Sequence, residues 1–264
     1  MDLKQSRERH VPLFWAELDP EALASERLVI TGPDVRRIRK ALRLAPGDLI
    51  RVSNPEGQRY LARIEGFTGR GGVTVALLER LASQPGMVAR IVLGQGLPKG
   101  SKMDLIVQKS AELGVTTLVP LLTQRSILRS LPPDRGREKV IRWRRIALEA
   151  ARQSERAEVP HVSEMLDLPA FCRTYQGAEL KLLLWEDEPD RRLREALRED
   201  LPPRKPALEV AALVGPEGGF SPEEVEEAGR WGFAPVSLGA RVLRTETAPL
   251  ALLTLLLYHL GELG

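Results

Sequence analysis

The chain has 264 residues, of which 43% are hydrophobic and 28% are charged, and its formal net charge is +3. This composition is ordinary for a soluble globular protein with a real core, and the length allows one large domain or a small and a medium one. No apolar stretch approaches the ~18–20 residues that span a bilayer, and no secretory signal is visible, so we expect a cytoplasmic protein that is not bound to a membrane.

The first 80 residues have the pattern of several short β-strands. Residues 48–53 and 60–64 are strand-like and are separated by the turn-forming residues 54–57, and residues 73–78 are a further candidate strand. Several short strands at this spacing are typical of a small barrel. We therefore expect a β-barrel domain over residues 1–80.

From about residue 89, strands alternate with helices. Short apolar runs, as expected for strands buried on both faces of a parallel sheet, lie at residues 90–94, 115–122, 180–185, 208–214 and 235–238. The chain finishes in a helix around residues 248–260. This alternation predicts an α/β domain over residues 81–264.

Two helix starts carry specific signals. Ser101 is followed by Asp104, a pair similar to a capping box, and Gly114 is placed to end that helix. Ser221 is followed by Pro222 and Glu224, which predicts an N-cap, a proline in the first turn and an acid at the third helical position. Both helices would then begin shortly after a predicted strand.

Positive charge gathers in one long helical segment. Residues 124–156 carry 10 basic and 4 acidic side chains, whereas residues 157–264 carry 11 basic and 19 acidic ones. Such asymmetry would orient the molecule toward a polyanion, although charge that merely varies between segments is an equally good explanation.

Several common catalytic motifs are missing. The three histidines, His10, His161 and His259, show no ligand spacing, and Cys172 is the only cysteine, so we expect neither a metal site nor a disulfide. No G-x-S-x-G elbow, P-loop or G-x-G-x-x-G follows a predicted strand. This argues against hydrolases, nucleotide triphosphatases and ordinary dinucleotide enzymes.

Two glycine-containing loops each follow a predicted buried strand. The first is Gly215–Phe220, with the sequence GPEGGF, and the second is Gly239–Thr247, with the sequence GARVLRTET. In open α/β sheets, ligands bind beyond the carboxyl ends of the strands, where glycines let the backbone come close to a ligand. Either loop alone is more easily explained as a tight turn, but the pair favours a binding site.

The segments LVGPEGGF (residues 213–220) and LGARVLRTETA (residues 238–248) resemble the RsmE-type 16S rRNA uridine-N3 methyltransferases of the SPOUT superfamily. The front domain resembles the family less tightly, at residues 41–48 and Tyr60. Between these regions, the resemblance continues at Lys99–Gly100, Met103, Lys109, Glu112–Val115, Arg125–Ser126, Arg142–Trp143, Glu149–Ala150, Gln153–Ser154, Arg156 and Val159–Pro160. It therefore covers nearly the whole chain.

The chain departs from the family at three places. Arg36–Arg37 stand where histidines are usual, and His10–Phe14 match the family's N-terminal segment only loosely. Glu155 follows Gln153–Ser154, where a glycine is common. These departures concern the expected contacts with RNA rather than the two glycine loops.

The resemblance implies a PUA-like, RNA-binding β-barrel over residues 1–80 and a SPOUT α/β domain over residues 81–264, whose C-terminal segment forms a trefoil knot. It implies a homodimer with the pocket near the subunit interface. It also implies S-adenosyl-L-methionine as the cofactor, held by the knot loops. The residues that the resemblance assigns to the cofactor are Leu184, Trp185, Glu186, Gly215, Pro216, Glu217, Gly218, Gly219, Leu238, Gly239, Arg241, Val242, Leu243, Arg244 and Thr245.

The implied reaction is methylation of N3 of a uridine in 16S rRNA, within a small-subunit particle. N3 carries a proton and lies on the pairing edge, so the base must be unpaired and deprotonated. A cation near the uracil oxygens would stabilise the anion, and a carboxylate or water would accept the proton. The candidates are Arg125, Arg156 and Arg244 for the cation, and Glu217 and Glu246 for the proton acceptor. For Glu246 a helix cap, and for Arg244 an ion pair with Glu246, are structural alternatives.

RNA binding is expected to use two basic segments, residues 36–43 and residues 142–156. Phosphate contacts of this kind give affinity and salt dependence but little sequence choice. The candidate residues are Arg36, Arg37, Arg39, Lys40, Arg43, Arg125, Arg142, Arg145, Arg152 and Arg156. A solvated helix face remains the alternative for either segment. Two rival functions also stay open: a SPOUT methyltransferase acting on a tRNA ribose or base, and a non-catalytic rRNA-binding assembly protein.

Overall fold

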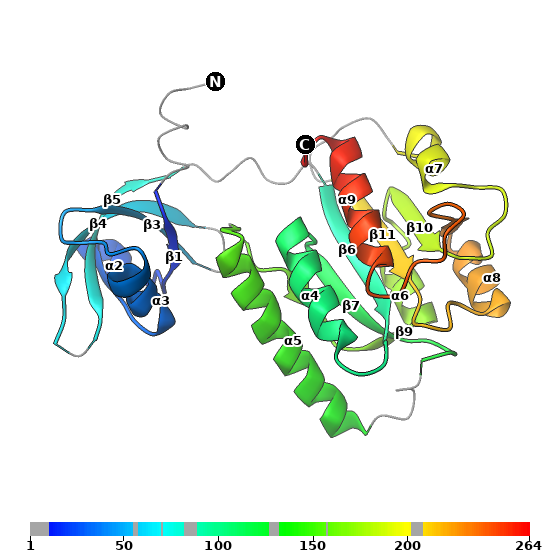
Figure 1. Cartoon of the computed structure of the whole chain (residues 1–264), viewed down its shortest axis with the longest axis horizontal. Coiled ribbons are helices and arrows are strands. Elements are labelled where there is room, and N and C mark those ends of the chain that lie inside the picture. Colours follow the sequence, from blue (N-terminus) through cyan, green and yellow to red (C-terminus); the bar gives the residue numbers. More distant parts are fainter. Residues whose placement is uncertain are drawn as a thin grey trace. The chain divides into compact units, whose positions relative to one another are not determined.

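The computed structural model of the chain describes residues 11–54, 58–69, 71–81, 89–126, 132–156, 158–201 and 208–264 (Figure 1). Most of the turn expected at residues 54–57, Arg70 and His10 lie outside the described residues. The chain divides into two compact units, one comprising residues 1–86 and 152–159 and the other residues 87–151 and 160–264. Residues 152–159, which sequence reading grouped with the second domain, therefore cluster with the first.

The first unit is built on a five-stranded sheet with the order β1-β3-β4-β5-β2. Strands β3 (Leu49–Ser53), β4 (Arg59–Phe67) and β5 (Val73–Arg80) coincide with the three segments expected from sequence and pair antiparallel. Alternate residues of β5 are buried, which explains its period-2 pattern. The other elements, which the sequence analysis did not identify, are β1 (Leu13–Trp15), β2 (Arg27–Ile30), α2 (Pro20–Ser25), α3 (Pro33–Arg36) and the π-helical η1 (Arg37–Ala41).

The second unit is a parallel sheet with the order β12-β10-β11-β6-β7-β8, and β9 also pairs with β7. The apolar runs at residues 180–185 and 208–214 form its centre, since β10 and β11 pair in register along their length. The strands are β6 (Ala89–Gly96), β7 (Thr117–Leu122), β8 (His161–Val162), β9 (Leu166–Asp167), β10 (Leu180–Leu184), β11 (Leu208–Val214) and β12 (Ala234–Val236). The predicted α/β class is confirmed.

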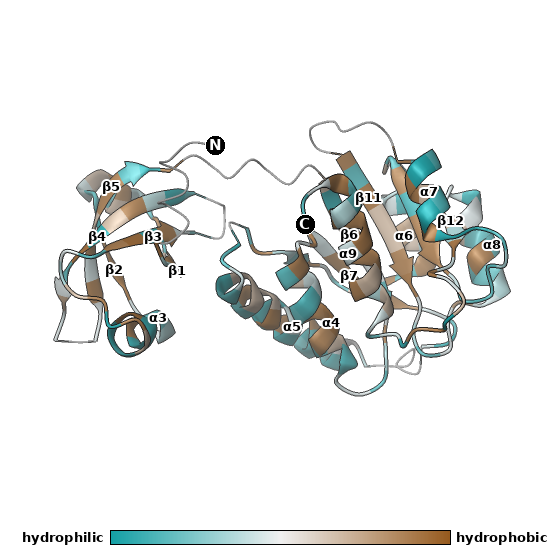
Figure 2. Cartoon of the chain, turned by 45° about the horizontal axis from the view of Figure 1, so that its top comes forward, coloured by the Kyte–Doolittle hydropathy of each residue, from teal (hydrophilic) through white to brown (hydrophobic). Residues whose placement is uncertain are grey.

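Helices cover both faces of this sheet, so the strands are buried between two apolar layers. On one face, α4 (Lys102–Leu113), α5 (Pro133–Gln153), α7 (Leu193–Glu199) and α9 (Ala248–Leu260) share a core with alternate residues of the strands. On the other face, the core includes α6 (Leu168–Thr174) and α8 (Pro222–Arg230). Figure 2 shows the hydrophobic colouring of β6, β7 and β11 between these helices.

The two predicted capping signals have different outcomes. Ser221 accepts a hydrogen bond from Glu224 N, and the Glu224 carboxylate accepts from Ser221 N, so the second capping box is confirmed. The capping pair at Ser101 is wrong, because the Ser101 side chain makes no cap bond. Asp104 instead accepts hydrogen bonds from Arg142 and from Trp143 Nε1 at 3.1 Å. A buried indole N–H needs an acceptor, and Asp104 supplies it.

A departure from the family pattern also has a local explanation. Glu155 has a φ of 53°, the left-handed region that favours glycine, so its backbone accounts for the glycine that is common there. The Glu155 carboxylate accepts a hydrogen bond from Arg51 at 2.6 Å, within the first unit. This partly buried ion pair offsets part of the free-energy cost of the positive φ at Glu155, and a glycine could not form it.

The chain after β12 runs back across the sheet. β12 lies at the edge beyond β10, whereas α9 packs on β6 and α4. Residues 238–247, which connect them, therefore pass over the carboxyl ends of the central strands. We call residues 215–220 the first loop and residues 238–247 the second loop. Among the described residues, no helix is long and apolar enough to cross a membrane.

Candidate functional site

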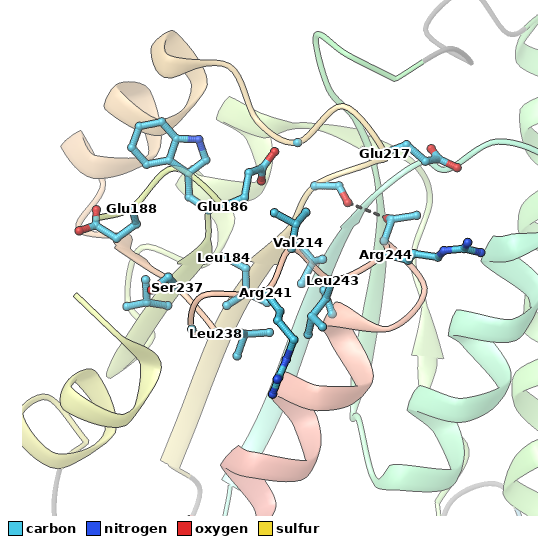
Figure 3. A pocket seen from close by; sticks show the side chains of 18 of the residues that line it. Leu184, Glu186, Glu188, Val214, Glu217, Ser237, Leu238, Arg241, Leu243 and Arg244 are labelled. Carbon is cyan, nitrogen blue, oxygen red and sulfur yellow. Dashed lines mark hydrogen bonds between the residues drawn. The ribbon is translucent and has the colours of Figure 1, made fainter. Parts of the chain in front are cut away.

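A cavity of about 650 Å³ opens at the carboxyl ends of β10, β11 and β12 (Figure 3). Its walls are the first loop, the second loop and the segment that follows β10. The apolar part of the lining includes Leu184, Val214, Val236, Leu238 and Leu243. Charged side chains surround it, with Glu188 at one end and Glu217 and Arg244 at the other (Figure 3). The cavity is therefore where the glycine loops predicted it.

The first loop disfavours side chains at two of its glycines, Gly219 because of its positive φ and Gly215 because the backbone of Gly219 lies beside it. Gly219 has a φ of +65°, and a Cβ atom there would lie 2.1 Å from Glu186 Oε1. A Cβ atom on Gly215 would lie 2.9 Å from the Gly219 carbonyl carbon. The loop runs straight into the capped N-terminus of α8, which fixes its far end. Glycine is thus required for the close approach of backbone to cavity as well as for the turn.

A buried polar cluster joins the floor of the two loops. The Thr245 hydroxyl donates to the Gly215 carbonyl at 2.8 Å, and Gln95 Nε2 donates to the same carbonyl and to Thr245 Oγ1, each at 3.2 Å. Gln95 is fully buried at the end of β6. Beside it, a Cβ atom on Gly96 would lie 2.5 Å from Pro216 Cδ, so β6 and the first loop are in direct contact. Three chain segments therefore meet at one point under the cavity.

A charged cluster joins the same two loops at the rim. Lys102 Nζ lies 2.9 Å from Glu217 Oε1 in the first loop and 3.2 Å from Glu246 Oε2 in the second. The backbone N–H of Lys99 also donates to the Glu217 carboxylate. Arg244 is nearby, but its guanidinium is 4.0 Å from Glu246 and its side chain is 83% exposed. Lys102 is thus the principal partner of both carboxylates.

These contacts change the titration of the charged cluster. Partial burial alone would raise the pKa of Glu217, but hydrogen bonds from Lys102 and from backbone N–H groups outweigh it and lower that pKa below its ordinary value. The pKa of Lys102 is raised, chiefly by its bond to Glu217, against a smaller opposing effect of burial. Both groups are therefore held in their charged forms at neutral pH.

Arg125 lies behind the first loop rather than in the cavity. Its guanidinium donates to the Gly218 carbonyl at 2.7 Å. The neighbouring Gln124 N donates to the Glu224 carboxylate at 2.7 Å, and Ser221 Oγ contacts the Gln124 side chain at 3.0 Å. The turn after β7 therefore supports the outer side of the first loop.

A family model described as an RNA methyltransferase domain matches residues 85–257, which contain every element of this site. The ribosomal RNA small subunit methyltransferase E of Synechocystis is 33% identical over 232 residues, covering 87% of this chain and 72% of that protein. The chain belongs to the ribosomal RNA small subunit methyltransferase E family.

Two solved structures of such proteins have the same fold. The ribosomal RNA small subunit methyltransferase E of Neisseria gonorrhoeae, bound to S-adenosyl methionine, aligns with a TM-score of 0.75 and 29% identity over 94% of this chain and 98% of that one. A Legionella pneumophila methyltransferase in complex with the same cofactor aligns with a TM-score of 0.76 and 30% identity over the same shares. The α/β unit described above is a methyltransferase fold.

The cavity suits a ligand of the kind those two relatives bind. Its volume lies in the range of small-molecule sites, and its lining is an apolar wall with a few polar groups. The glycines of the first loop expose backbone at the wall, and Trp185 Nε1, which is buried, lacks a hydrogen-bond partner among the described residues. The lining therefore combines apolar surface that suits an aromatic base with backbone and charged groups that suit a polar tail.

Most residues that the sequence assigned to the cofactor line this cavity. The exception is Gly218, which faces Arg125. Of the candidates for catalysis, Glu217 and Arg244 line the cavity, Glu246 contacts Lys102 beside it, and Arg125 stands behind the first loop. Arg156 clusters with the first unit and is not among the cavity residues. Burial lowers the pKa of its guanidinium to about 10, against the attraction of Glu158.

The sequence did not identify three residues of the site: Gln95, Gly96 and Lys102. Gln95 and Gly96 extend β6 beyond the apolar run at residues 90–94, and a polar residue at the carboxyl end of a buried strand was the signal available. Lys102 was overlooked between Lys99–Gly100 and Met103, although those neighbours carried the family resemblance. Its role appears only when the two loops are brought to the start of α4.

The candidate RNA-binding residues are distributed over both units. In the first unit, Arg37 lies over the ring of Phe14 and Arg39 over the ring of Phe67, at 5.3 and 4.8 Å from the ring centres. Arg36, Lys40 and Arg43 are exposed near them in the sequence. Arg152 also clusters with the first unit. On α5, Arg142 is paired with Asp104, whereas Arg145 is exposed.

Proposed function

We propose that this protein transfers a methyl group from S-adenosyl-L-methionine to N3 of a uridine in 16S rRNA, within a small-subunit particle in the cytoplasm. The observation that carries the proposal is the enclosure of one cavity by both glycine loops and the segment after β10. The names of the relatives and the cofactor in two related structures support the same reaction.

The protein's part in this reaction is to position and orient the methyl donor and the uridine base and to exclude water from them. When bound, S-adenosylmethionine supplies a methyl group on a sulfonium, which is already activated for transfer. Gly215, Gly219, Leu238 and Leu243 line the cavity, and they would hold the donor there. The protein then brings the uridine base to the open side of the cavity and keeps it there.

Arg244 is the residue that we propose to stabilise the uracil anion. Its guanidinium is exposed at the rim, and its one ion-pair contact among the described residues is with Glu246 at 4.0 Å, so it can turn toward a substrate. Cations placed where negative charge develops give large rate effects. Arg125 is already bonded to Gly218, and we assign it the positioning of the first loop.

Glu217 is poorly suited to accept the N3 proton. A general base works best when its pKa lies near the working pH, whereas the pKa of Glu217 is lowered by its partners. Glu246 shares Lys102 with Glu217, and its carboxylate forms an ion pair with that ammonium group at 3.2 Å. Both carboxylates are better explained by a positioning role.

The basic residues Arg36–Arg43, with Arg125, Arg142, Arg145, Arg152 and Arg156, are proposed to contact rRNA. Charge neutralisation of the Arg36–Arg43 stretch should weaken RNA binding and reduce its salt slope, because each phosphate contact releases counterions. Filter binding at several salt concentrations measures both quantities. An unchanged affinity and slope would exclude that stretch from the RNA interface.

Three architectural features complete the proposal. The five-stranded sheet of the first unit is proposed to be a PUA-like barrel, and the crossing of the second loop over the sheet to be part of a trefoil knot. A homodimer is supported by exposed apolar side chains on the adjacent helices α4 and α9: Leu105, Leu255 and Tyr258. Replacing Leu255 with glutamate should give a monomer in light scattering, and an unchanged dimer would exclude this face.

The reaction is tested by incubating the protein with isotope-labelled S-adenosylmethionine and either small-subunit particles or naked 16S rRNA. Digestion to nucleosides should place the label in 3-methyluridine. Label in a ribose, or transfer that occurs only when tRNA is supplied in a parallel reaction, would instead favour a methyltransferase with another target. Cofactor binding in calorimetry without any transfer would favour a non-catalytic rRNA-binding protein.

A further inference from the structure

The bridge Glu217–Lys102–Glu246 connects three elements that are far apart in the sequence. Lys102 is the first residue of α4, Glu217 belongs to the first loop and Glu246 to the second. We propose that Lys102 is a positioning residue that keeps the two loops at the separation at which the methyl donor binds, by neutralising the two carboxylates that both lie beside its ammonium group. This inference rests on the proposed donor site.

The geometry gives Lys102 a role that no neighbouring cation duplicates. Among the described residues, it is the cation within ion-pair distance of Glu217, and it is 0.8 Å closer to Glu246 than Arg244 is, at 3.2 against 4.0 Å. Glu246 Oε2 is buried and accepts no hydrogen bond from the described residues, so the ammonium charge is its compensation. The Lys99 amide fixes the other carboxylate in place.

The surroundings of the bridge make its charges matter. The side chains of Glu246 and Glu217 are only 18% and 27% exposed, and that of Lys102 is 35% exposed. Water screens such charges less than it screens fully exposed ones, so repulsion between the carboxylates is substantial once the cation is removed. The raised pKa of Lys102 and the lowered pKa of Glu217 agree with a bridge that is charged throughout the neutral range.

The bridge and the buried cluster at Gln95 connect the same two loops at different depths. The buried cluster is neutral and ties Thr245 to Gly215 under the cavity. The bridge ties Glu246, which follows Thr245, to Glu217, which is two residues after Gly215. It lies at the rim, where Lys102 and Glu217 line the cavity itself. Loss of the bridge should therefore spread the loops at the rim while the floor stays joined.

This mechanism makes a prediction that a direct contact between Lys102 and a ligand does not. If Lys102 acts by cancelling repulsion, then removal of one carboxylate should compensate for removal of the ammonium. The Lys102→Met protein carries two unbalanced carboxylates, whereas the double variant Lys102→Met/Glu246→Gln carries one. A lysine that contacts the donor or the RNA directly gains nothing from the second change.

The test is calorimetric titration of S-adenosylmethionine, without RNA, into the full-length wild type, Lys102→Met, Lys102→Met/Glu246→Gln and Lys102→Arg. We expect the single Met variant to bind about tenfold more weakly, in the range of typical coupling effects. The double variant and Lys102→Arg should recover most of the affinity. The loss should shrink in high salt, because salt screens the repulsion.

The outcomes distinguish a failure of the proposed function from a failure of the proposed role of Lys102. A wild type that does not bind S-adenosylmethionine defeats the proposed function. A wild type that binds, together with a Lys102→Met protein that binds equally well, overturns the role of Lys102 alone. Weak binding by both Met variants also overturns it, since this indicates a direct contact with the donor. If Lys102→Met does not fold, Lys102→Gln and Lys102→Gln/Glu246→Gln give the same comparison: the single variant should bind more weakly and the double variant should recover, and wild-type binding by the single variant would overturn the role.

Discussion

The two loops of the site differ in how they are held. The first loop is mostly buried, and its residues contact Gln95, Arg125 and the capping box of α8. The second loop is exposed over residues 240–242 and at Arg244, with the Val242 side chain 81% exposed. In the described part of the chain, it is anchored near its end by the Thr245 hydroxyl and by the ion pair between Glu246 and Lys102. The first loop is thus the more firmly held of the two, and we expect the exposed part of the second loop to be the part that contacts RNA.

The largest expected effect is on the second loop. Arg244→Ala should lower methyl transfer about 100-fold, because a preorganised cation at a developing anion is lost. Stability should change by less than about 0.5 kcal/mol, since the side chain is 83% exposed. Turnover and thermal unfolding measure the two quantities. Arg230→Ala, an exposed arginine on α8, is the matched control, and equal losses of turnover and melting temperature would rule out the catalytic role.

A change beside the first loop should, unlike Arg244→Ala, reduce the stability of the protein. A methyl group at Gly96 would collide with Pro216, so Gly96→Ala should lower the free energy of unfolding by about 1–3 kcal/mol. Affinity for S-adenosylmethionine should fall with it. Gly229→Ala on α8 has open space and serves as the control. Chemical denaturation measures the free energy of unfolding. If Gly96→Ala is as stable as the wild type, the first loop is not rigidly supported.

Removal of the hydrogen bond that joins the two loops should lower the free energy of unfolding by an intermediate amount. Thr245→Val keeps the shape but removes the hydroxyl that donates to Gly215, at an expected cost of about 1 kcal/mol. Thr254→Val removes a hydroxyl that only donates within α9 at an exposed position, and it should be nearly neutral. Denaturation curves for the two variants compare them directly. Equal costs would show that the buried cluster contributes nothing special.

The smallest effect concerns pH. The lowered pKa of Glu217 gives a stabilisation that is present above the ordinary carboxylate range and is lost as pH falls through its lowered value. The raised pKa of Lys102 gives one that is complete below its ordinary value and is lost as pH rises through the raised value. The stability difference between wild type and Lys102→Met should be constant near neutrality and shrink at both extremes. A difference that is independent of pH would contradict the charged bridge.

The sequence predicted the elements better than the way they meet. Apolar runs located the central strands, and the signals at Ser221 and Gly114 located two helix ends, because these are set by nearby residues. Short elements such as β1, β8 and β9 were missed, since pairing with longer strands rather than their own pattern defines them. Asp104 was misread as a cap because its partner, Trp143, is 39 residues away.

The site shows the same limit. Glycines and charges in the two loops indicated the cavity, because loops after parallel strands gather at one edge of a sheet. Gln95 and Lys102 belong to the site only through contacts 115 to 150 residues away in the chain, and no local pattern reports these contacts. The family resemblance assigned roles to the loops, while the structure supplied the residues that join them.

The central claim is that this cavity serves methylation of a uridine in 16S rRNA. The most direct test maps modified nucleotides in 16S rRNA from cells with and without this protein. We predict that one uridine loses its N3 methyl group in its absence, and that the wild type but not Arg244→Ala restores it. An unchanged set of 16S rRNA modifications, or restoration by Arg244→Ala at the wild-type level, would contradict the account.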